Sequence, residues 1–199
     1  MRENRLERKT KETNITLSLR LDDATPSTIN TGIGFFDHML TLMSFQALIC
    51  MDIHCTGDLQ VDGHHTVEDI GIALGKALDR ALGDRAGITR YGSCMLPMDD
   101  ALVTVALDIS GRAYLGWDAE LPASRVGDFD VELAREFCQA FSRSLGLTLH
   151  VRMHSGYNTH HILEAIFKGL GNALRQAVSI DAARADTIPS SKGVLKEIE

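Results

Sequence analysis

The sequence lacks the features of a membrane, secreted or polyanion-binding protein. No apolar run approaches the roughly 18 residues that a membrane-spanning helix needs. The first residues, MRENRLERK, lack the apolar core of a signal peptide. A formal net charge of -7 gives no bulk attraction to nucleic acid or to an anionic membrane surface. We therefore expect a cytoplasmic protein with no nucleic-acid partner and no membrane partner.

Cysteine is also scarce, and none of it is arranged as a metal-binding pair. The four cysteines are Cys50, Cys55, Cys94 and Cys138, and they form no CxxC motif. This argues against a closed structural zinc site and is typical of reduced, buried thiols in an intracellular protein. No segment is low in complexity. We expect loose structure only over residues 1–10 and in the tail from Asp181.

A metal-binding phrase, HHxxE, occurs twice, with the second copy 96 positions after the first. On a helix, residues three or four positions apart share a face, whereas adjacent residues diverge by about 100°. Each glutamate can therefore share a metal with one histidine while the other histidine points toward a second site. The duplication predicts two metals. The residues of the two phrases are His64, His65, Glu68, His160, His161 and Glu164.

Each phrase precedes an apolar stripe with helical spacing, so we expect each to open a long helix. The positive potential at a helix N-terminus disfavours imidazolium and keeps a histidine neutral, as a metal ligand must be. His38 and Glu136 occupy corresponding places in the two halves, and we predict both as ligands. Mixed nitrogen and oxygen donors with open positions suit Mn, Fe or Zn. The remaining histidines, on strand patterns, are predicted to be structural: His54, His150 and His154.

The order of sequence patterns repeats between the two halves of the chain. Each half gives a strand, a Phe-Asp segment opening a helix (Phe36-Asp37 and Phe129-Asp130), more strand, and then the metal phrase with a long helix. This predicts an α+β fold with an internal duplication, in which helices pack on one face of mostly antiparallel sheets. We assign residues 1–93 to the first repeat. Residues 94–199 form the second repeat with its C-terminal tail.

Several cations and hydroxyls indicate an anion site in this acidic protein. The tail segment IPSSKG combines Ser190, Ser191 and Lys192 with a flexible glycine, as a phosphate site needs, although a solvated loop can have the same composition. Lys168 lies one helical turn past the second phrase, which places an ammonium beside the metal site. A phosphate bound near two metals would explain why these cations and hydroxyls occur together in an acidic protein. The other two candidate cations are Arg90 and Arg112.

Six motifs, spread in order over nearly the whole chain, resemble the imidazoleglycerol-phosphate dehydratase family. They are RKTKET at 8–13, TGIGFFDHML at 31–40, GHHTVED at 63–69, SGR at 110–112, NTHHILEAIFK at 158–168 and IPSSKG at 188–193. The resemblance implies loss of water from imidazole glycerol phosphate to give imidazole acetol phosphate in histidine biosynthesis. It also implies a duplicated fold like the second domain of ribosomal protein S5. Two Mn²⁺ per active site and a shell of twenty-four subunits, which share ligands between neighbours, are implied as well.

Carried over to this sequence, the resemblance implies a role for each motif residue. Glu12 is implied as the acid/base group, and His65, Glu68, His161 and Glu164 belong to the catalytic centre. Many relatives have histidine in place of Glu136 and of Gln46, and we keep Gln46 as a substrate contact. The implied metal ligands are His38, His64, His65, Glu68, Glu136, His160, His161 and Glu164. The implied substrate contacts are Glu12, Gln46, Arg90, Arg112, Lys168, Ser190, Ser191 and Lys192.

The chemistry explains why such a reaction needs a metal. The proton that leaves the glycerol chain is not next to a carbonyl, so the imidazole ring must supply electrons. A manganese-bound imidazolate could expel the hydroxyl while Glu12 removes the neighbouring proton. The residues alone also allow a two-metal phosphate-ester hydrolase, or metal bridges that only hold an oligomer together. A di-metal four-helix bundle would need Glu-x-x-His motifs, and the strands contradict it.

Overall fold

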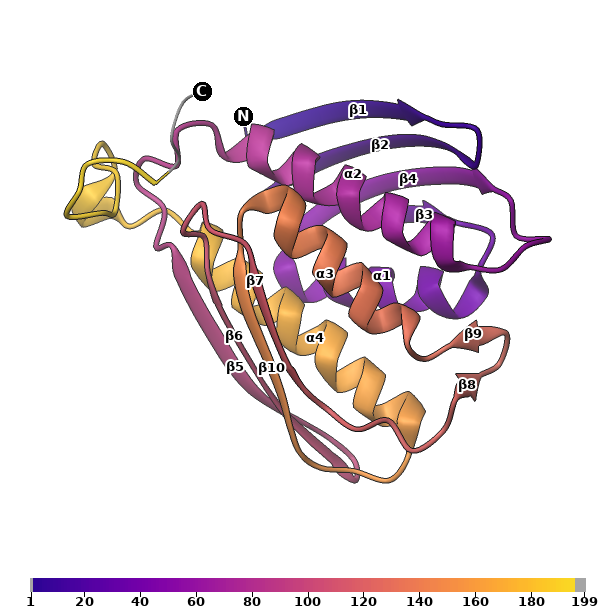
Figure 1. Cartoon of the computed structure of the whole chain (residues 1–199). Coiled ribbons are helices and arrows are strands. Elements are labelled where there is room, and N and C mark those ends of the chain that lie inside the picture. The colour runs from indigo at the N-terminus through magenta and orange to yellow at the C-terminus, as the bar shows by residue number, and fades with distance from the viewer. Residues whose placement is uncertain (1, 196–199) are drawn as a thin grey trace.

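The computed structural model describes residues 2–195, and its two halves follow the same topology (Figure 1). The first half contains β1 (Glu3–Lys9), β2 (Thr13–Leu21), β3 (Thr28–Asn30), α1 (Gly34–Ala47), β4 (Ile49–Gly57) and α2 (His64–Leu82). The second contains β5 (Tyr91–Met98), β6 (Ala101–Asp108), β7 (Tyr114–Asp118), β8 (Arg125–Val126), β9 (Phe129–Asp130), α3 (Leu133–Leu145), β10 (Thr148–Ser155) and α4 (Thr159–Val178). A 3₁₀ turn, Ala182–Arg184, follows. Apart from the β8–β9 hairpin, the order of elements is identical.

The two main sheets also have matching strand orders. The first is β1-β2-β4-β3 and the second is β5-β6-β10-β7. In both sheets the first three strands are antiparallel, and the fourth runs parallel to its neighbour. The predicted α+β class, with an internal duplication and mostly antiparallel sheets, is therefore confirmed. The predicted boundary between residues 93 and 94 falls inside β5, and the division into two repeats at that point stays a proposal.

The helices lie between the two sheets, so each sheet is covered on one face (Figure 1). α2 packs on β1 and β2, and α4 packs on β5 and β6. Across the middle, α2 contacts α3 and α1 contacts α4. One continuous cluster of buried apolar side chains joins the layers, from Leu17 through Phe141 to Val105. Because burial of this apolar surface drives folding, the packing fixes the helix N-termini relative to one another.

Both metal phrases open helices, as predicted. Asn158 caps α4, since its side-chain oxygen accepts hydrogen bonds from the backbone N–H groups of His160 and His161. In the first half, Asp62 plays a similar part by accepting the backbone N–H of His64 at 2.8 Å. Each phrase is therefore fixed at the start of its helix by a short polar side chain.

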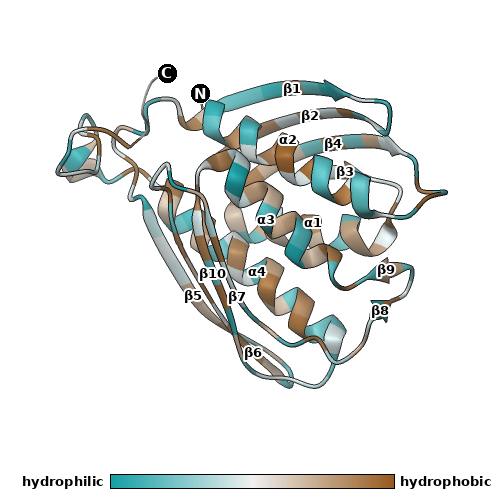
Figure 2. Ribbon diagram, in the orientation of Figure 1, coloured by the Kyte–Doolittle hydropathy of each residue, from teal (hydrophilic) through white to brown (hydrophobic). Residues whose placement is uncertain are grey.

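The expectation that the first ten or so residues are loose is wrong for the part of this segment that the structure describes. Residues 3–9 form the edge strand β1, which pairs with β2 from Glu3 to Lys9. Leu6 is buried on its inner side, whereas the other side chains are polar and at least partly exposed, and Figure 2 shows β1 as mostly hydrophilic. Charged side chains of this kind protect an edge strand from pairing with other chains. A single buried apolar residue leaves too weak an alternation for the strand to be recognised from sequence.

The expected correspondence of the two Phe-Asp segments is also wrong. Phe36 and Asp37 lie in the first turn of α1, but Phe129 and Asp130 form β9, and α3 begins only at Leu133. The reason is the β8–β9 hairpin, in which Arg125 and Asp130 form an ion pair at 2.8 Å. The ring of Phe129 still stacks on that of Phe36, with centroids 6.0 Å apart.

The cysteines are free thiols, as the absence of a CxxC motif led us to expect. All four cysteines lie in the described residues and are free; Cys50, Cys55 and Cys138 are buried and Cys94 is half-buried. Burial raises the pKa of the Cys138 thiol to about 12. Within residues 2–195, no helix combines the length and apolar character that crossing a membrane requires.

Candidate active site

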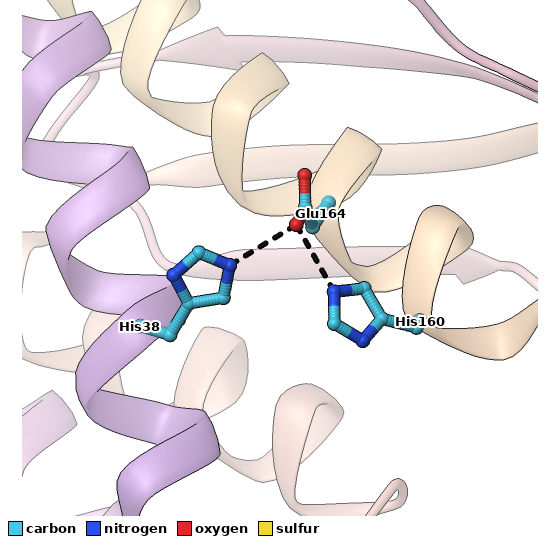
Figure 3. Close-up of side chains that lie close together, drawn as sticks. All are labelled: His38, His160 and Glu164. Carbon is cyan, nitrogen blue, oxygen red and sulfur yellow. Dashed lines mark hydrogen bonds and ion pairs between the residues drawn. The ribbon is translucent and has the colours of Figure 1, made fainter.

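Three predicted metal ligands meet where α1 packs against α4 (Figure 3). His38 comes from α1, and His160 and Glu164 come from the first turns of α4. The Nε2 atoms of both histidines lie 3.0 Å from Oε1 of Glu164. One ligand atom from each residue lies within 4.8 Å of the other two. Because His160 and Glu164 are four positions apart, they share one face of α4, while His38 reaches them from the other half of the chain.

The carboxylate at the centre of this cluster stays ionised although it is buried. Burial alone would raise the pKa of Glu164, but hydrogen bonds from Lys168, His38 and His160 outweigh it and lower the pKa to about 2. Nζ of Lys168 forms a short ion pair with the second carboxylate oxygen, Oε2. At neutral pH the site therefore offers an anionic oxygen, two imidazole nitrogens and a neighbouring ammonium group.

The second histidine of each phrase is held by a carboxylate outside this cluster. Nδ1 of His65 lies 3.0 Å from Asp58, and Nδ1 of His161 lies 2.6 Å from Asp100. The hydrogen bond to Asp58 raises the pKa of His65. Two backbone N–H groups before α4, together with His161, keep the pKa of Asp100 well below its usual range. A carboxylate on Nδ1 orients the ring and leaves Nε2 as the atom that can bind a metal.

Sequence reasoning missed both of these aspartates. Asp100 lies in the turn between β5 and β6, and its contact with His161 spans 61 positions. Asp58 follows β4 directly, seven positions before His65. Neither position shows a recognisable spacing, because the contacts depend on how the strands meet the helices. The aspartates can be recognised as partners of the histidines only once the fold is known.

Acidic side chains from two corresponding strand turns face the free Nε2 atoms. Oε1 of Glu12, in the β1–β2 turn, lies 3.8 Å from Nε2 of His65. Oδ2 of Asp99, in the β5–β6 turn, lies 3.6 Å from Nε2 of His161. The strand pairing thus folds the start of the chain over the first phrase, the arrangement that the predicted role of Glu12 requires.

The matching ligand set of the other half is not gathered in the same way. In the internal repeat, His64 and Glu68 on α2 correspond to His160 and Glu164. Glu136 on α3 corresponds to His38. His64, Glu68 and Glu136 are half-buried. In the described part of the chain they do not form a second group of three ligand atoms as close as the first. Their ligand roles stay predictions.

Most of the predicted phosphate contacts lie at the opposite end of α4. The backbone N–H of Arg90 donates to the carbonyl of Ala177 in the last turn of that helix, at 2.8 Å. Its side chain pairs with Asp108 and donates to the carbonyl of Pro189 at 2.9 Å, next to Ser190. The tail that contains Ser190, Ser191 and Lys192 therefore lies beside Arg90, beyond the end of α4 in Figure 1. We call this region, where the predicted phosphate contacts Arg90, Ser190, Ser191 and Lys192 gather, the phosphate end, and we call the first turns of α4, with the predicted metal ligands, the metal end.

The remaining predicted contacts are spread over the chain. Arg112 is exposed in the loop after β6, where the backbone N–H of Gly111 donates to the carbonyl of Gly146. Lys168 pairs with Glu164 in the cluster of predicted metal ligands. Gln46 accepts a hydrogen bond from Asn172 at 3.1 Å, further along α4. α4 has 20 residues, so at 1.5 Å per residue its ends are about 30 Å apart. One chain does not bring its metal cluster and its phosphate end together.

The three histidines that were predicted to be structural lie on strands, as expected. His54 lies on β4, and His150 and His154 lie on β10. All three are exposed rather than buried. Nε2 of His154 is within 2.7 Å of the hydroxyl of Thr104 on the neighbouring strand.

The fold is that of a duplicated α+β protein, and each of its two long helices begins with histidines and a carboxylate. Further acid–base groups lie next to these residues, as in the active site of an enzyme. The family model for imidazoleglycerol-phosphate dehydratase matches residues 31–174. The chain belongs to the imidazoleglycerol-phosphate dehydratase family. It is therefore a member of a family of hydro-lyases of histidine biosynthesis, as the resemblance of its motifs predicted.

Individual relatives agree over almost the full length. The imidazoleglycerol-phosphate dehydratase of Dinoroseobacter shibae is 56% identical over 195 residues, covering 98% of this chain and 100% of the relative. That of Moorella thermoacetica is 54% identical over 194 residues, covering 98% of each. The Staphylococcus aureus structure aligns with a TM-score of 0.82 at 41% identity, over 90% of this chain and 99% of its own. The Pyrococcus furiosus structure gives 0.80 at 41% identity, over 96% and 100%.

Proposed function

We propose that the chain dehydrates D-erythro-imidazole glycerol phosphate to imidazole acetol phosphate, using two Mn²⁺ per active site. The observation that carries the proposal is the meeting of His38, His160 and Glu164 at one point, in a chain of this family. A scaffold would need metal ligands but no acid–base group beside them. Here Glu12 and Lys168 lie next to the two phrases.

The donor set fits manganese. The clustered atoms are two imidazole nitrogens and a carboxylate oxygen that is ionised at neutral pH. Such nitrogen and oxygen donors, without thiolate, suit Mn, Fe or Zn with positions left open for substrate, and the resemblance of the motifs favours manganese among them. The Nε2 atoms of His65 and His161, each fixed through Nδ1, are the next ligands. His64, Glu68 and Glu136 complete the proposed set. When bound, the ions supply Lewis acidity that favours loss of a proton from the substrate imidazole.

The chain's own groups supply acid–base chemistry and substrate binding. Glu12, beside His65, removes the proton from the glycerol carbon next to the one that loses hydroxide. Lys168 presents its ammonium group at the metal end, where it stabilises developing negative charge on the substrate. The phosphate group is held by charge-assisted hydrogen bonds from the phosphate end. The residues proposed for that contact are Arg90, Arg112, Ser190, Ser191 and Lys192.

The distance between the two ends supports a shared active site. His160 and Glu164 lie in the first turns of α4, and Arg90 contacts Ala177 in its last turn, so at 1.5 Å per residue the two ends are about 20–25 Å apart along the helix. A small phosphorylated substrate cannot span that distance. We therefore propose a homo-oligomer, a shell of twenty-four subunits, in which the metal end of one chain meets the phosphate end of a neighbour. The enzyme is proposed to act in the cytoplasm.

The test is incubation of the Mn²⁺-reconstituted protein with imidazole glycerol phosphate. The expected product is a ketone that retains its phosphate, detected by mass spectrometry and by carbonyl derivatisation. A His160→Ala variant is the control and should give no product. Release of inorganic phosphate would identify a two-metal hydrolase instead. Metal-dependent assembly without turnover of this substrate would identify a scaffold.

A further inference from the structure

A buried carboxylate with no predicted role follows the first metal phrase directly. Asp69 is 5% exposed and lies on α2. Its Oδ2 accepts a short hydrogen bond from the hydroxyl of Thr13, and its Oδ1 pairs with Nη2 of Arg8 at 2.7 Å. A charge buried in this way is costly unless it is paired and hydrogen-bonded. The two partners come from β1 and β2 and satisfy both carboxylate oxygens.

These partners flank the turn that carries Glu12. Arg8 is near the end of β1, and Thr13 is the first residue of β2. Inside the turn, the hydroxyl of Thr10 accepts the backbone N–H groups of Glu12 and Thr13 at 3.1 and 3.0 Å. Asp69 therefore ties both ends of the turn to α2, the helix that begins with His64 and His65.

A second connection fixes the same turn from the other side. The backbone N–H of Asp58 donates to the carbonyl of Glu12 at 3.0 Å, and the side chain of Asp58 bonds Nδ1 of His65. The Glu12 side chain is itself half exposed, and its turn ends an edge strand. Without these contacts, little would fix the position of its carboxylate beside His65.

The second half of the chain provides an internal comparison. The repeat of the HHxxE phrases places Ala165 where the first half has Asp69, and Ala101 opens β6 where Thr13 opens β2. Both alanines are buried, at 0% and 1% exposure. The same packing position is therefore compatible with an apolar pair, and the fold does not require the polar one. The polar group occurs in the half whose turn carries Glu12.

We propose that Asp69, with Thr13 and Arg8, is a positioning group that holds the Glu12 carboxylate at His65 and affects catalysis only through Glu12. The inference rests on the proposed function, in which Glu12 is the base. Catalysis is sensitive to such positioning, because a displacement of about 1 Å can cost on the order of 100-fold in rate. The two carboxylate oxygens of Asp69 bond Thr13 and Arg8, on either side of the turn that carries Glu12.

A double-mutant cycle on the Mn²⁺-loaded oligomer tests the proposal. Asp69→Asn and Thr13→Val are each made with Glu12 intact and in a Glu12→Gln background. With Glu12 intact, each should lower kcat by roughly 10- to 100-fold and change KM little. In the Glu12→Gln background, neither should lower kcat further. The matched control is Arg20→Gln, which breaks an ion pair with Asp23 at the far end of the same strand, β2, and should leave kcat unchanged.

The possible outcomes separate this inference from the proposed function. A near-normal kcat in Glu12→Gln alone would show that Glu12 is not the base. A loss in Glu12→Gln that multiplies with the loss in Asp69→Asn would show that Asp69 acts independently, and the inference would be wrong. Loss of bound manganese in Asp69→Asn would overturn it as well. If Asp69→Asn does not fold, Thr13→Val and Arg8→Gln, which keep the buried carboxylate, complete the same cycle.

Discussion

His160 and His161 are neighbours in the chain but serve different surroundings. The ring of His160 faces Glu164, whereas the ring of His161 faces Asp100. This divergence follows from the 100° step of the helix and supports the idea that each phrase contributes to two metal positions. The neighbouring carboxylates then decide which nitrogen is available.

Replacing Asp100 with asparagine should weaken metal binding, while the amide oxygen can still accept the backbone N–H groups of Tyr157 and Asn158 that precede α4. Asp100→Asn removes the carboxylate that accepts from Nδ1 of His161, so the ring loses its preferred orientation. Loss of such a partner ordinarily costs about 10- to 100-fold in metal affinity. Manganese titration of the apoprotein measures this effect. Asp118→Asn, which affects only an exposed ion pair with Arg152, is the control; equal affinities in the two variants would show that Asp100 does not orient a ligand.

Glu12 and Lys192 should affect different kinetic constants. Glu12→Gln preserves size and hydrogen bonding but removes the base, so kcat should fall roughly 10²- to 10⁴-fold with manganese content intact. Lys192→Ala should mainly raise KM, because phosphate is held alike in the ground and transition states. Steady-state kinetics distinguish the two. An unchanged KM in Lys192→Ala would mean that the tail is a solvated loop.

At the level of elements, corresponding glycines let the helices approach closely. A Cβ at Gly75 would lie 2.7 Å from Cβ of Ser144 on α3, and one at Gly171 would collide with the carbonyl of Met43 on α1. Gly75→Ala and Gly171→Ala should each therefore destabilise the protein by about 1–3 kcal/mol, the usual cost of overpacking. Thermal unfolding measures the loss. Gly34→Ala is the control, since a Cβ there meets nothing within 4 Å; equal stability of all three variants would contradict the close packing.

Elements with long, regular patterns could be predicted from sequence, and short ones could not. The four helices and the strands β2, β6 and β10 have apolar periodicity over many residues, so the spacing of their apolar residues is enough to predict them. β1 has one buried side chain, and β8 and β9 have two residues each. The same limit applies to the site. The HHxxE spacing is local and visible, but Asp58, Asp69 and Asp100 act through contacts between elements that no local pattern encodes.

On the scale of the whole molecule, the helix α4 separates the cluster of predicted metal ligands from the predicted phosphate contacts. Its first turns carry His160 and Glu164, and its last turn contacts Arg90. The second HHxxE phrase and the IPSSKG tail, which the family resemblance assigns to one active site, therefore lie far apart within one chain. The sequence predicts a phosphate near the metals, and a single subunit does not bring the predicted metal ligands and the predicted phosphate contacts together. Neighbouring subunits are the simplest physical solution, because symmetry repeats the same contact at every interface.

Mixed oligomers should test this shared site directly. His160→Ala damages the metal end, and the double variant Arg112→Ala, Lys192→Ala damages the phosphate end. Each protein alone should show little activity at low substrate concentration. When the two are co-expressed in equal amounts, up to about a quarter of the sites should combine an intact metal end from one chain with an intact phosphate end from another, because partners are chosen at random. Dehydratase activity per site, measured on particles purified through a tag on each variant, reports that fraction. If one chain supplied both ends, every site would contain a damaged end, and activity would not exceed the average of the separate variants.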